Sequence, residues 1–280
     1  MRSGPPSRPV HKWKSAHATL AAALLLLLAA RPAAGPSPPD SSDALAAGRA
    51  AFDARDPETA LRDFEQALAG DSMSYEANWR AALALITLGA ETPDSVKSPE
   101  RDSLYARAER YARRAVLADS MGADGHFILA RAIGQTALTK GTKQRIRLAS
   151  EVRSEALRAI ELDPQHDGAY HVLGRWNAEI MRLSWVSRFF ARQFLGAGIF
   201  NKASWDGAIT NLERAVEIDP RRIVHRLDLA RVYVDRKRYE DARRELATLD
   251  TLPIRDFNDP QYKGDGAALL RRIASKPDGK

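Results

Sequence analysis

The 280-residue chain contains no cysteine. This absence excludes disulfide bonds, cysteine nucleophiles, thiolate metal sites and a lipid-modified cysteine at a cleavage site. Catalytic motifs are also missing from the sequence: there is no HExxH, no GxSxG and no glycine-rich strand-to-helix turn. His166 and His171 are five residues apart, which does not match the i, i+4 spacing of a helical metal pair. We therefore expect no enzyme activity, no cofactor and no metal.

A hydrophobic run long enough to span a membrane is missing as well. The most apolar stretch, residues 18–30, is 13 residues long, whereas a membrane helix needs roughly 17–25 residues. Basic residues precede this stretch and RPAAGPSPP follows it, which is the order of a secretory signal peptide. We predict a signal peptide over residues 1–34, a flexible linker over 35–42, and export to the periplasm or the extracellular space. The alternative is an uncleaved leader that anchors the chain in a membrane.

The part of the chain after the leader has little excess of positive charge. The formal net charge is +7, but five basic residues and no acidic residue fall within residues 1–39. A nucleic-acid-binding domain normally carries its basic excess in the folded part. We therefore expect no nucleic-acid partner.

What the chain does contain is a cadence of small residues and prolines that is typical of helical hairpins. Between residues 169 and 220 the sequence opens as AYHVLGRW and closes as AITNLERAVEIDP. Gly174 lets a second helix cross closely, Leu212 fills the gap between the two helices, and Pro220 ends the second helix. This spacing is that of a tetratricopeptide repeat.

The same cadence predicts an all-α fold, a tetratricopeptide-like solenoid of about five helical hairpins with a C-terminal capping helix. Each hairpin buries its apolar face against its neighbours, and the last one needs a cap. The repeat domain is expected over residues 43–275. Its predicted hairpins are 43–74, 75–120, 121–164, 165–220 and 221–254, followed by the cap 255–275.

One segment carries a family resemblance. The sequence ELDPQHDGAYHVLGRWNAEIMRLSWVSRFFARQFLGA resembles the regulator of microtubule dynamics family, whose repeats carry a similar LGRW, then LSW and an apolar insert. RLASEVRSEALRAIELDP before it and AITNLERAVEIDP after it also fit, and the resemblance covers most of residues 76–275. It implies an exported, bacterial-type relative: an α-helical repeat protein that acts through association and has no enzymatic machinery. Microtubule association is not expected in an exported protein.

Arginine recurs at one position in the first helix of most repeats, directly after the small residue where the helices cross. In such hairpins this position points into the concave groove. The series is Arg49, Arg131, Arg175 and Arg231, with Arg80 one turn earlier in the repeat that lacks it. Guanidinium groups suit an anionic ligand such as an acidic peptide, a C-terminal carboxylate or a phosphate. The alternative is that each arginine pairs within the fold, as Arg175 would with Glu179 at i, i+4.

The insert within the fourth hairpin, residues 179–205, is more apolar than an ordinary turn. Its aromatic residues fall on one helix face, namely Trp185, Phe189, Phe190 and Phe194. Such a helix suits a membrane surface, a partner, or the wall of a cavity for an acyl chain. The alternative is that it folds over the concave face and completes the core. As a roof with Arg131 and Arg175 at the mouth, it predicts a pocket of several hundred Å³ for an anionic amphiphile.

Together these patterns predict an exported, non-enzymatic scaffold that mediates protein–protein interaction through its concave face. The alternative function is binding or carriage of an anionic lipid or amphiphile in a pocket roofed by the insert 179–205. A membrane contact would arise from the insert or from an uncleaved leader.

Overall fold

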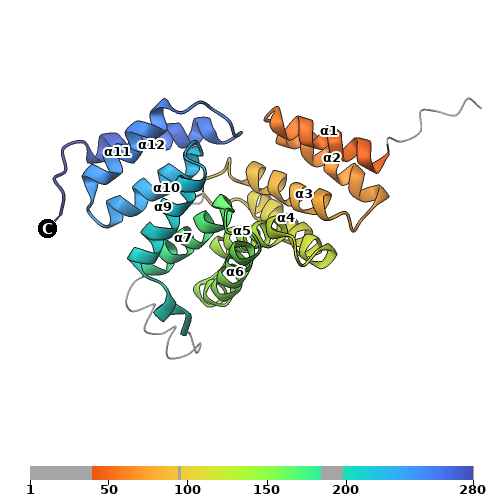
Figure 1. Ribbon diagram of the computed structural model, residues 1–280, viewed down its shortest axis with the longest axis horizontal. Coiled ribbons are helices and arrows are strands. Elements are labelled where there is room, and N and C mark those ends of the chain that lie inside the picture. The colour runs from red at the N-terminus through yellow and green to blue at the C-terminus, as the bar shows by residue number, and fades with distance from the viewer. Residues whose placement is uncertain (1–39, 94–95, 184–197, 280) are drawn as a thin grey trace, which may run out of the picture. The chain divides into compact units, whose positions relative to one another are not determined.

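The computed structural model describes residues 40–93, 96–183 and 198–279. All of these residues belong to one compact unit, Pro39–Lys280. These residues form eleven α-helices, one 3-10 helix and no β-strand (Figure 1). The predicted all-α fold is therefore confirmed. The predicted signal peptide lies outside the described residues.

The helices follow one another as pairs packed side by side: α1 with α2, α3 with α4, α5 with α6, α7 with α9, and α10 with α11. The pairs stack in chain order, which is the arrangement of a helical-hairpin solenoid. α1 begins two residues before the predicted start of the repeat domain. The helices are α1 Ser41–Asp53, α2 Pro57–Gly70, α3 Tyr75–Gly89, α4 Pro99–Ala118, α5 Ala123–Leu138, α6 Thr142–Leu162, α7 Asp167–Arg182, α9 Trp205–Ile218, α10 Ile223–Asp235, α11 Tyr239–Thr251 and α12 Asp259–Ile273, with the 3-10 helix η1 Gly198–Lys202 before α9.

The turns between successive pairs share one local device. An aspartate follows the second helix, and its carboxylate accepts a hydrogen bond of 2.8–3.1 Å from the backbone N–H two residues later. This Asx turn reverses the chain and starts the next pair. The aspartates are Asp71, Asp119, Asp163 and Asp219. These four aspartates therefore mark the boundaries between the repeats in the sequence.

Close helix crossings depend on glycine. A Cβ atom placed on Gly174 of α7 would lie 2.6 Å from Cγ of Leu212 and 3.1 Å from its backbone nitrogen in α9. Leu212 is fully buried. The small residue therefore sets the distance between the two helices of the fourth pair.

Two hydrophobic clusters form the core, and α7 contributes to both. The first cluster runs from α1 to α7 and includes Trp176 and Ile180. The second begins at Ala178 on the same helix and ends at Leu269 and Ile273 of α12. α12 thus covers the last pair, as the predicted capping helix requires.

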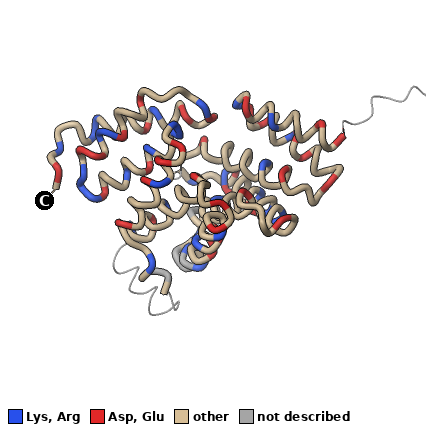
Figure 2. The backbone as a smooth tube through the Cα atoms, viewed as in Figure 1, with Lys and Arg blue, Asp and Glu red and all other residues tan. Residues whose placement is uncertain are grey.

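Charged residues of both signs alternate along the helices (Figure 2). No described helix has the combination of length and low polarity that crossing a bilayer requires.

Candidate functional site

The first helices of successive pairs, together with α12, line one side of the solenoid, which we call the inner face. α3 contacts α5, α5 contacts α7, α7 contacts α10, and α10 contacts α12. A cavity of about 500 Å³, the inner cavity, opens on this face. Its polar walls are formed by Arg175, Glu179 and Arg182 of α7, Asp228, Arg231 and Asp235 of α10, and Gln261, Tyr262 and Asp265 of α12.

Asp228 is the centre of the polar contacts in the inner cavity. Its buried carboxylate accepts a hydrogen bond from Nε2 of His171 at 2.9 Å and one from Nη1 of Arg231 at 2.9 Å. Nε of Arg175 lies 3.5 Å from the same carboxylate. Burial alone would raise the pKa of Asp228. The charge of Arg175, the hydrogen bond from His171 and the charge of Arg231 outweigh burial and hold that pKa well below its usual range.

Further ion pairs join the helices around the cavity. Nη2 of Arg231 also donates to Asp265 of α12 at 2.8 Å. Nη2 of Arg182 in α7 donates to Asp235 of α10 at 2.6 Å. These pairs are about one-third to one-half exposed, with side-chain exposures of 32–45%. Exposed pairs of this kind contribute little to stability, so their groups remain available to a ligand.

Arg131 of α5 differs from the other inner-face arginines. No described residue forms a hydrogen bond or an ion pair with its guanidinium, which is half-buried. Burial lowers the pKa of Arg131, and the positive charges of Arg222 and Arg175 lower it further. Tyr262 and Asp256 act on this pKa in the opposite direction. Within the described residues, the inner face therefore holds a cation without a direct counter-charge.

The arginine series predicted from the sequence divides into two groups. Arg131, Arg175 and Arg231 come together on the inner face around α5, α7 and α10. Arg49 and Arg80 instead both pair with Glu76 of α3, and Arg80 does so at 2.6 Å. Arg175 pairs with Asp228 of the next repeat. This contact fits the alternative prediction, in which the arginines pair within the fold. Whether these residues bind a ligand stays a prediction.

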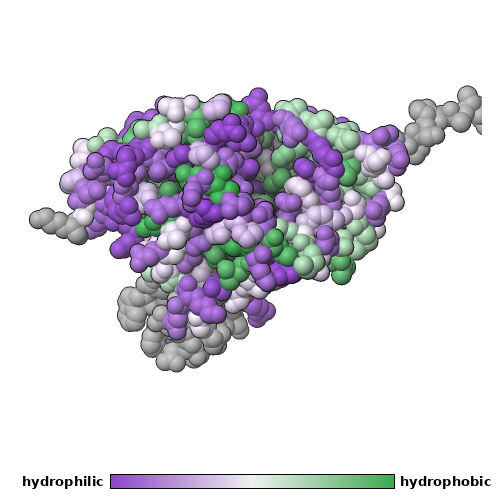
Figure 3. All heavy atoms as spheres, in the orientation of Figure 1, coloured by the Kyte–Doolittle hydropathy of each residue, from purple (hydrophilic) through white to green (hydrophobic). Residues whose placement is uncertain are grey.

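A second, smaller site lies beside the inner cavity. A cleft of about 140 Å³, the apolar cleft, opens between α5, α6 and α7. Figure 3 shows an apolar area at the surface over α5, with hydrophilic residues around it. Its apolar walls are Ala130, Ala137, Ala149, Val152, Val172, Trp176, Ile180 and Leu183, and its polar margin includes Arg131, Gln135, Arg145, Arg175 and Glu179. The cleft thus combines apolar walls with cationic groups at its edge.

The aromatic residues of the predicted roof fall in one stretch of the insert, between the described residues 183 and 198. Trp185, Phe189, Phe190 and Phe194 all lie outside the described residues. The cleft bounded by the described residues is smaller than the several hundred Å³ expected for an acyl chain. The roofed pocket stays a prediction.

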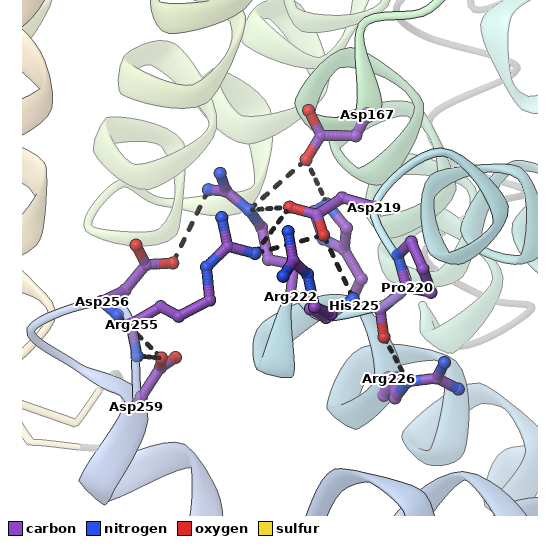
Figure 4. A network of polar contacts seen from close by, with 10 residues as sticks. Asp167, Asp219, Pro220, Arg222, His225, Arg226, Arg255, Asp256 and Asp259 are labelled. Carbon is purple, nitrogen blue, oxygen red and sulfur yellow. Dashed lines mark hydrogen bonds and ion pairs between the residues drawn. The ribbon is translucent and has the colours of Figure 1, made fainter. Parts of the chain in front are cut away.

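A polar network that the sequence did not indicate joins the start of α7, the turn between α9 and α10, and the loop before α12 (Figure 4). Nε of Arg222 lies 3.4 Å from Asp167 and 3.5 Å from Asp219, and Nη1 lies 3.7 Å from Asp256. Nε2 of His225 lies 2.7 Å from Asp167. Burial raises the pKa of Asp167, but the hydrogen bond from His225 and the charge of Arg222 lower it below its usual range. Arg222 and Asp219 are only three residues apart, but the partners Asp167 and Asp256 are too far from Arg222 in sequence to be paired by spacing alone.

Histidine and carboxylate groups meet here without forming a metal site. The rings of His171 and His225 lie 4.6 Å apart, and each ring has its own aspartate partner. Within the ranges that the structure covers, no group of three or more metal-ligating side chains converges. The arrangement supplies charged hydrogen bonds and ion pairs to the inner face.

The sequence of the chain is similar to proteins of one known family. A family model described as "Regulator of microtubule dynamics protein 1-3" matches residues 43–274. Regulator of microtubule dynamics protein 1 of Bos taurus is 25% identical over 207 residues, which cover 74% of this chain and 64% of the bovine protein. The protein of the same name from Caenorhabditis elegans is 27% identical over 131 residues, 47% of this chain and 57% of that protein. The chain therefore spans less than two thirds of these relatives.

A solved structure has the same fold. The crystal structure of a thermophilic TPR protein of Thermus thermophilus superposes with a TM-score of 0.61. The match covers 82% of this chain and 99% of that protein, at 17% sequence identity. This likeness concerns the fold, and it confirms the predicted tetratricopeptide-like solenoid.

Proposed function

This chain belongs to the regulator of microtubule dynamics family, and from that premise we propose that it is a non-enzymatic scaffold that binds a protein partner through its inner face. The observation that carries the proposal is the inner cavity of about 500 Å³ with its walls of paired charges. Interfaces that form and dissociate are about as polar as the rest of a protein surface and use hydrogen bonds at their rim. Stacked helical pairs also present an extended surface suited to a partner chain.

The groups that would meet the partner are partly exposed and come from three helices. Arg182, Arg231 and Asp265 have side-chain exposures of 36%, 39% and 45%. Each sits in an ion pair that an incoming charged side chain can exchange at low cost. A partner segment with both signs of charge fits this surface. We do not extend the microtubule association in the family's name to this chain, because the leader predicted over residues 1–34 would export it.

Position-dependent photo-cross-linking tests the proposal. A benzoyl-phenylalanine at Gln261, which lines the inner cavity, should cross-link to a protein partner in extracts of the native cell. The same group at Arg110, exposed on α4, is the matched control and should not. Mass spectrometry of the adducts identifies the partner. Cross-links from Arg110 alone, or from neither position, would refute the proposal.

A second function, binding of an anionic amphiphile, is favoured by the apolar cleft. Its apolar walls lie next to Arg131, Arg145 and Arg175, which suits an amphiphile whose negative headgroup meets these arginines. The cleft itself takes only part of an acyl chain, and the remainder would lie under the roof predicted over residues 179–205. The test is native mass spectrometry and lipid extraction of the purified protein. A co-purifying acyl ligand favours the second function, and an empty protein with a protein cross-link favours the first.

We also propose that the chain is exported. The support is the basic, apolar and proline-rich order of residues 1–39. The mass of the mature N-terminus tests this: a chain that starts near residue 35 fits cleavage, and an intact leader in a membrane fraction fits the anchored alternative.

A further inference from the structure

The apolar cleft and the inner cavity are neighbouring parts of one surface. Gln135, Arg175 and Glu179 line both of them. Arg131 stands at the edge of the cleft, while Tyr262 lines the cavity. A ligand at the three shared residues therefore borders both the cleft and the cavity.

The size of the cleft sets what enters it. A cavity of about 150 Å³ lined by aliphatic and aromatic side chains holds one benzene ring. The cleft has about 140 Å³, and its walls include the small residues Ala130, Ala137 and Ala149. The indole Nε1–H of Trp176 already donates a hydrogen bond to the carbonyl of Ala149 at 2.7 Å. This donor therefore does not need a polar atom of the ligand as a partner. One phenylalanine or leucine side chain fits, and a whole acyl chain does not.

The charge of Arg131 at the edge of the cleft determines which residue of a partner fits beside the apolar side chain. Arg175 and Arg231 are already paired with Asp228, whereas the guanidinium of Arg131 has no direct partner among the described residues. A half-buried cation flanked by two others gains more from an anion than an exposed cation does. A carboxylate placed there accepts two parallel N–H bonds from the guanidinium.

We propose that Arg131 and the apolar cleft together recognise a partner segment in which one apolar side chain is followed by one acidic side chain. This inference rests on the proposed function and names the residues of the partner that the inner face recognises. The apolar side chain enters the cleft between α5, α6 and α7, and the carboxylate binds the Arg131 guanidinium. A basic residue at the second position is rejected, because Arg131, Arg175 and Arg222 would repel it.

Peptide titration with the full chain tests the pairing. The probes are acetylated and amidated tetrapeptides of sequence Gly-Phe-Asp-Gly, Gly-Phe-Asn-Gly and Gly-Ala-Asp-Gly, measured by chemical-shift changes of the protein amides. The charged hydrogen bond should make the Phe-Asp peptide bind about tenfold more tightly than Phe-Asn. Loss of the ring should weaken the Ala-Asp peptide by about tenfold or more.

Two variants with a matched control locate the two contacts. Arg131→Gln should remove the preference for Asp over Asn and leave the affinity for Phe-Asn unchanged. Gly134→Leu should weaken every peptide that contains Phe, because Gly134 lines the cleft and a Cβ atom placed there meets nothing within 4 Å. The open space also keeps the fold intact in that variant. Arg110→Gln, on exposed α4, should change neither affinity.

Several outcomes would overturn the inference. These are equal binding of Phe-Asp and Phe-Asn to the wild type, an unchanged preference in Arg131→Gln, and no effect of Gly134→Leu. Binding to phosphatidylglycerol vesicles that depends on Arg131, with no peptide binding, would assign the site to a lipid headgroup instead. If the peptides fail while the Gln261 cross-links to a protein persist, this inference fails and the proposed function stands. Loss of those cross-links removes both.

Discussion

The close crossing of α7 and α9 makes a quantitative prediction for Gly174→Ala. Alanine is favoured over glycine in a helix interior by about 1 kcal/mol. The new methyl group, however, would lie 2.6 Å from Cγ of Leu212 and 3.1 Å from its backbone nitrogen. A backbone atom cannot rotate away, so the two helices must separate. Overpacking of this kind costs about 1–3 kcal/mol.

A second glycine separates the steric cost from helix propensity. Gly134 lies within α5, and a Cβ atom there meets nothing within 4 Å. Gly134→Ala should therefore raise the free energy of unfolding by about 1 kcal/mol. The difference between the two variants is the overpacking cost alone, about 1–3 kcal/mol.

Thermal unfolding followed by far-ultraviolet circular dichroism measures both variants. In a domain of this size each 1 kcal/mol shifts the Tm by about 2–4 °C. Gly134→Ala should melt above the wild type, and Gly174→Ala should melt clearly below Gly134→Ala. Equal stabilisation of the two variants would refute the role of Gly174 in setting the helix distance.

Three further predictions concern the inner face. Asp228→Asn should lower the free energy of unfolding by about 1–3 kcal/mol in chemical denaturation, because it removes the charged acceptor of the hydrogen bonds from His171 and Arg231, whereas the exposed Asp53→Asn should change it by less than about 0.5 kcal/mol. Burial lowers the pKa of His171 from 6.5 to about 4, so between these values the unfolded chain binds a proton that the folded chain does not. Stability should therefore fall as the pH drops from 6.5 to 4, by at most about 1.4 kcal/mol per pH unit for this group, and a profile equally steep in His171→Gln would contradict the assignment. Arg131→Met should raise the free energy of unfolding by up to about 1 kcal/mol while weakening the Phe-Asp peptide, and a destabilised variant would show that Arg131 is held by contacts within the fold.

The fold was predictable from the sequence because its determinants are local. Each turn between pairs is made by an aspartate and the backbone N–H two residues later, so the signal lies within a few residues. Gly174 and Leu212 also stand at positions that the repeat pattern fixes. Stacking then follows from the apolar face that every pair shares.

The candidate site was only partly predictable, because its contacts are long-range. The repeat position of Arg131, Arg175 and Arg231 indicated a shared face, and the structure brings these three together. The pairing of His171 with Asp228 joins residues 57 positions apart, and no spacing rule within a helix reports such a contact. Arg80 instead pairs with Glu76 four residues earlier in α3, whereas Arg49 meets Glu76 only because α1 lies beside α3.

α12 contributes both to the hydrophobic core and to the wall of the inner cavity. Leu269 and Ile273 of α12 close the second hydrophobic cluster, while Tyr262 and Asp265 of the same helix wall the inner cavity. Helices of one fold open locally with different free energies, and a ligand that binds only the packed form of a helix makes its opening rarer. Occupancy of the cavity would then be visible as slower amide hydrogen exchange in α12.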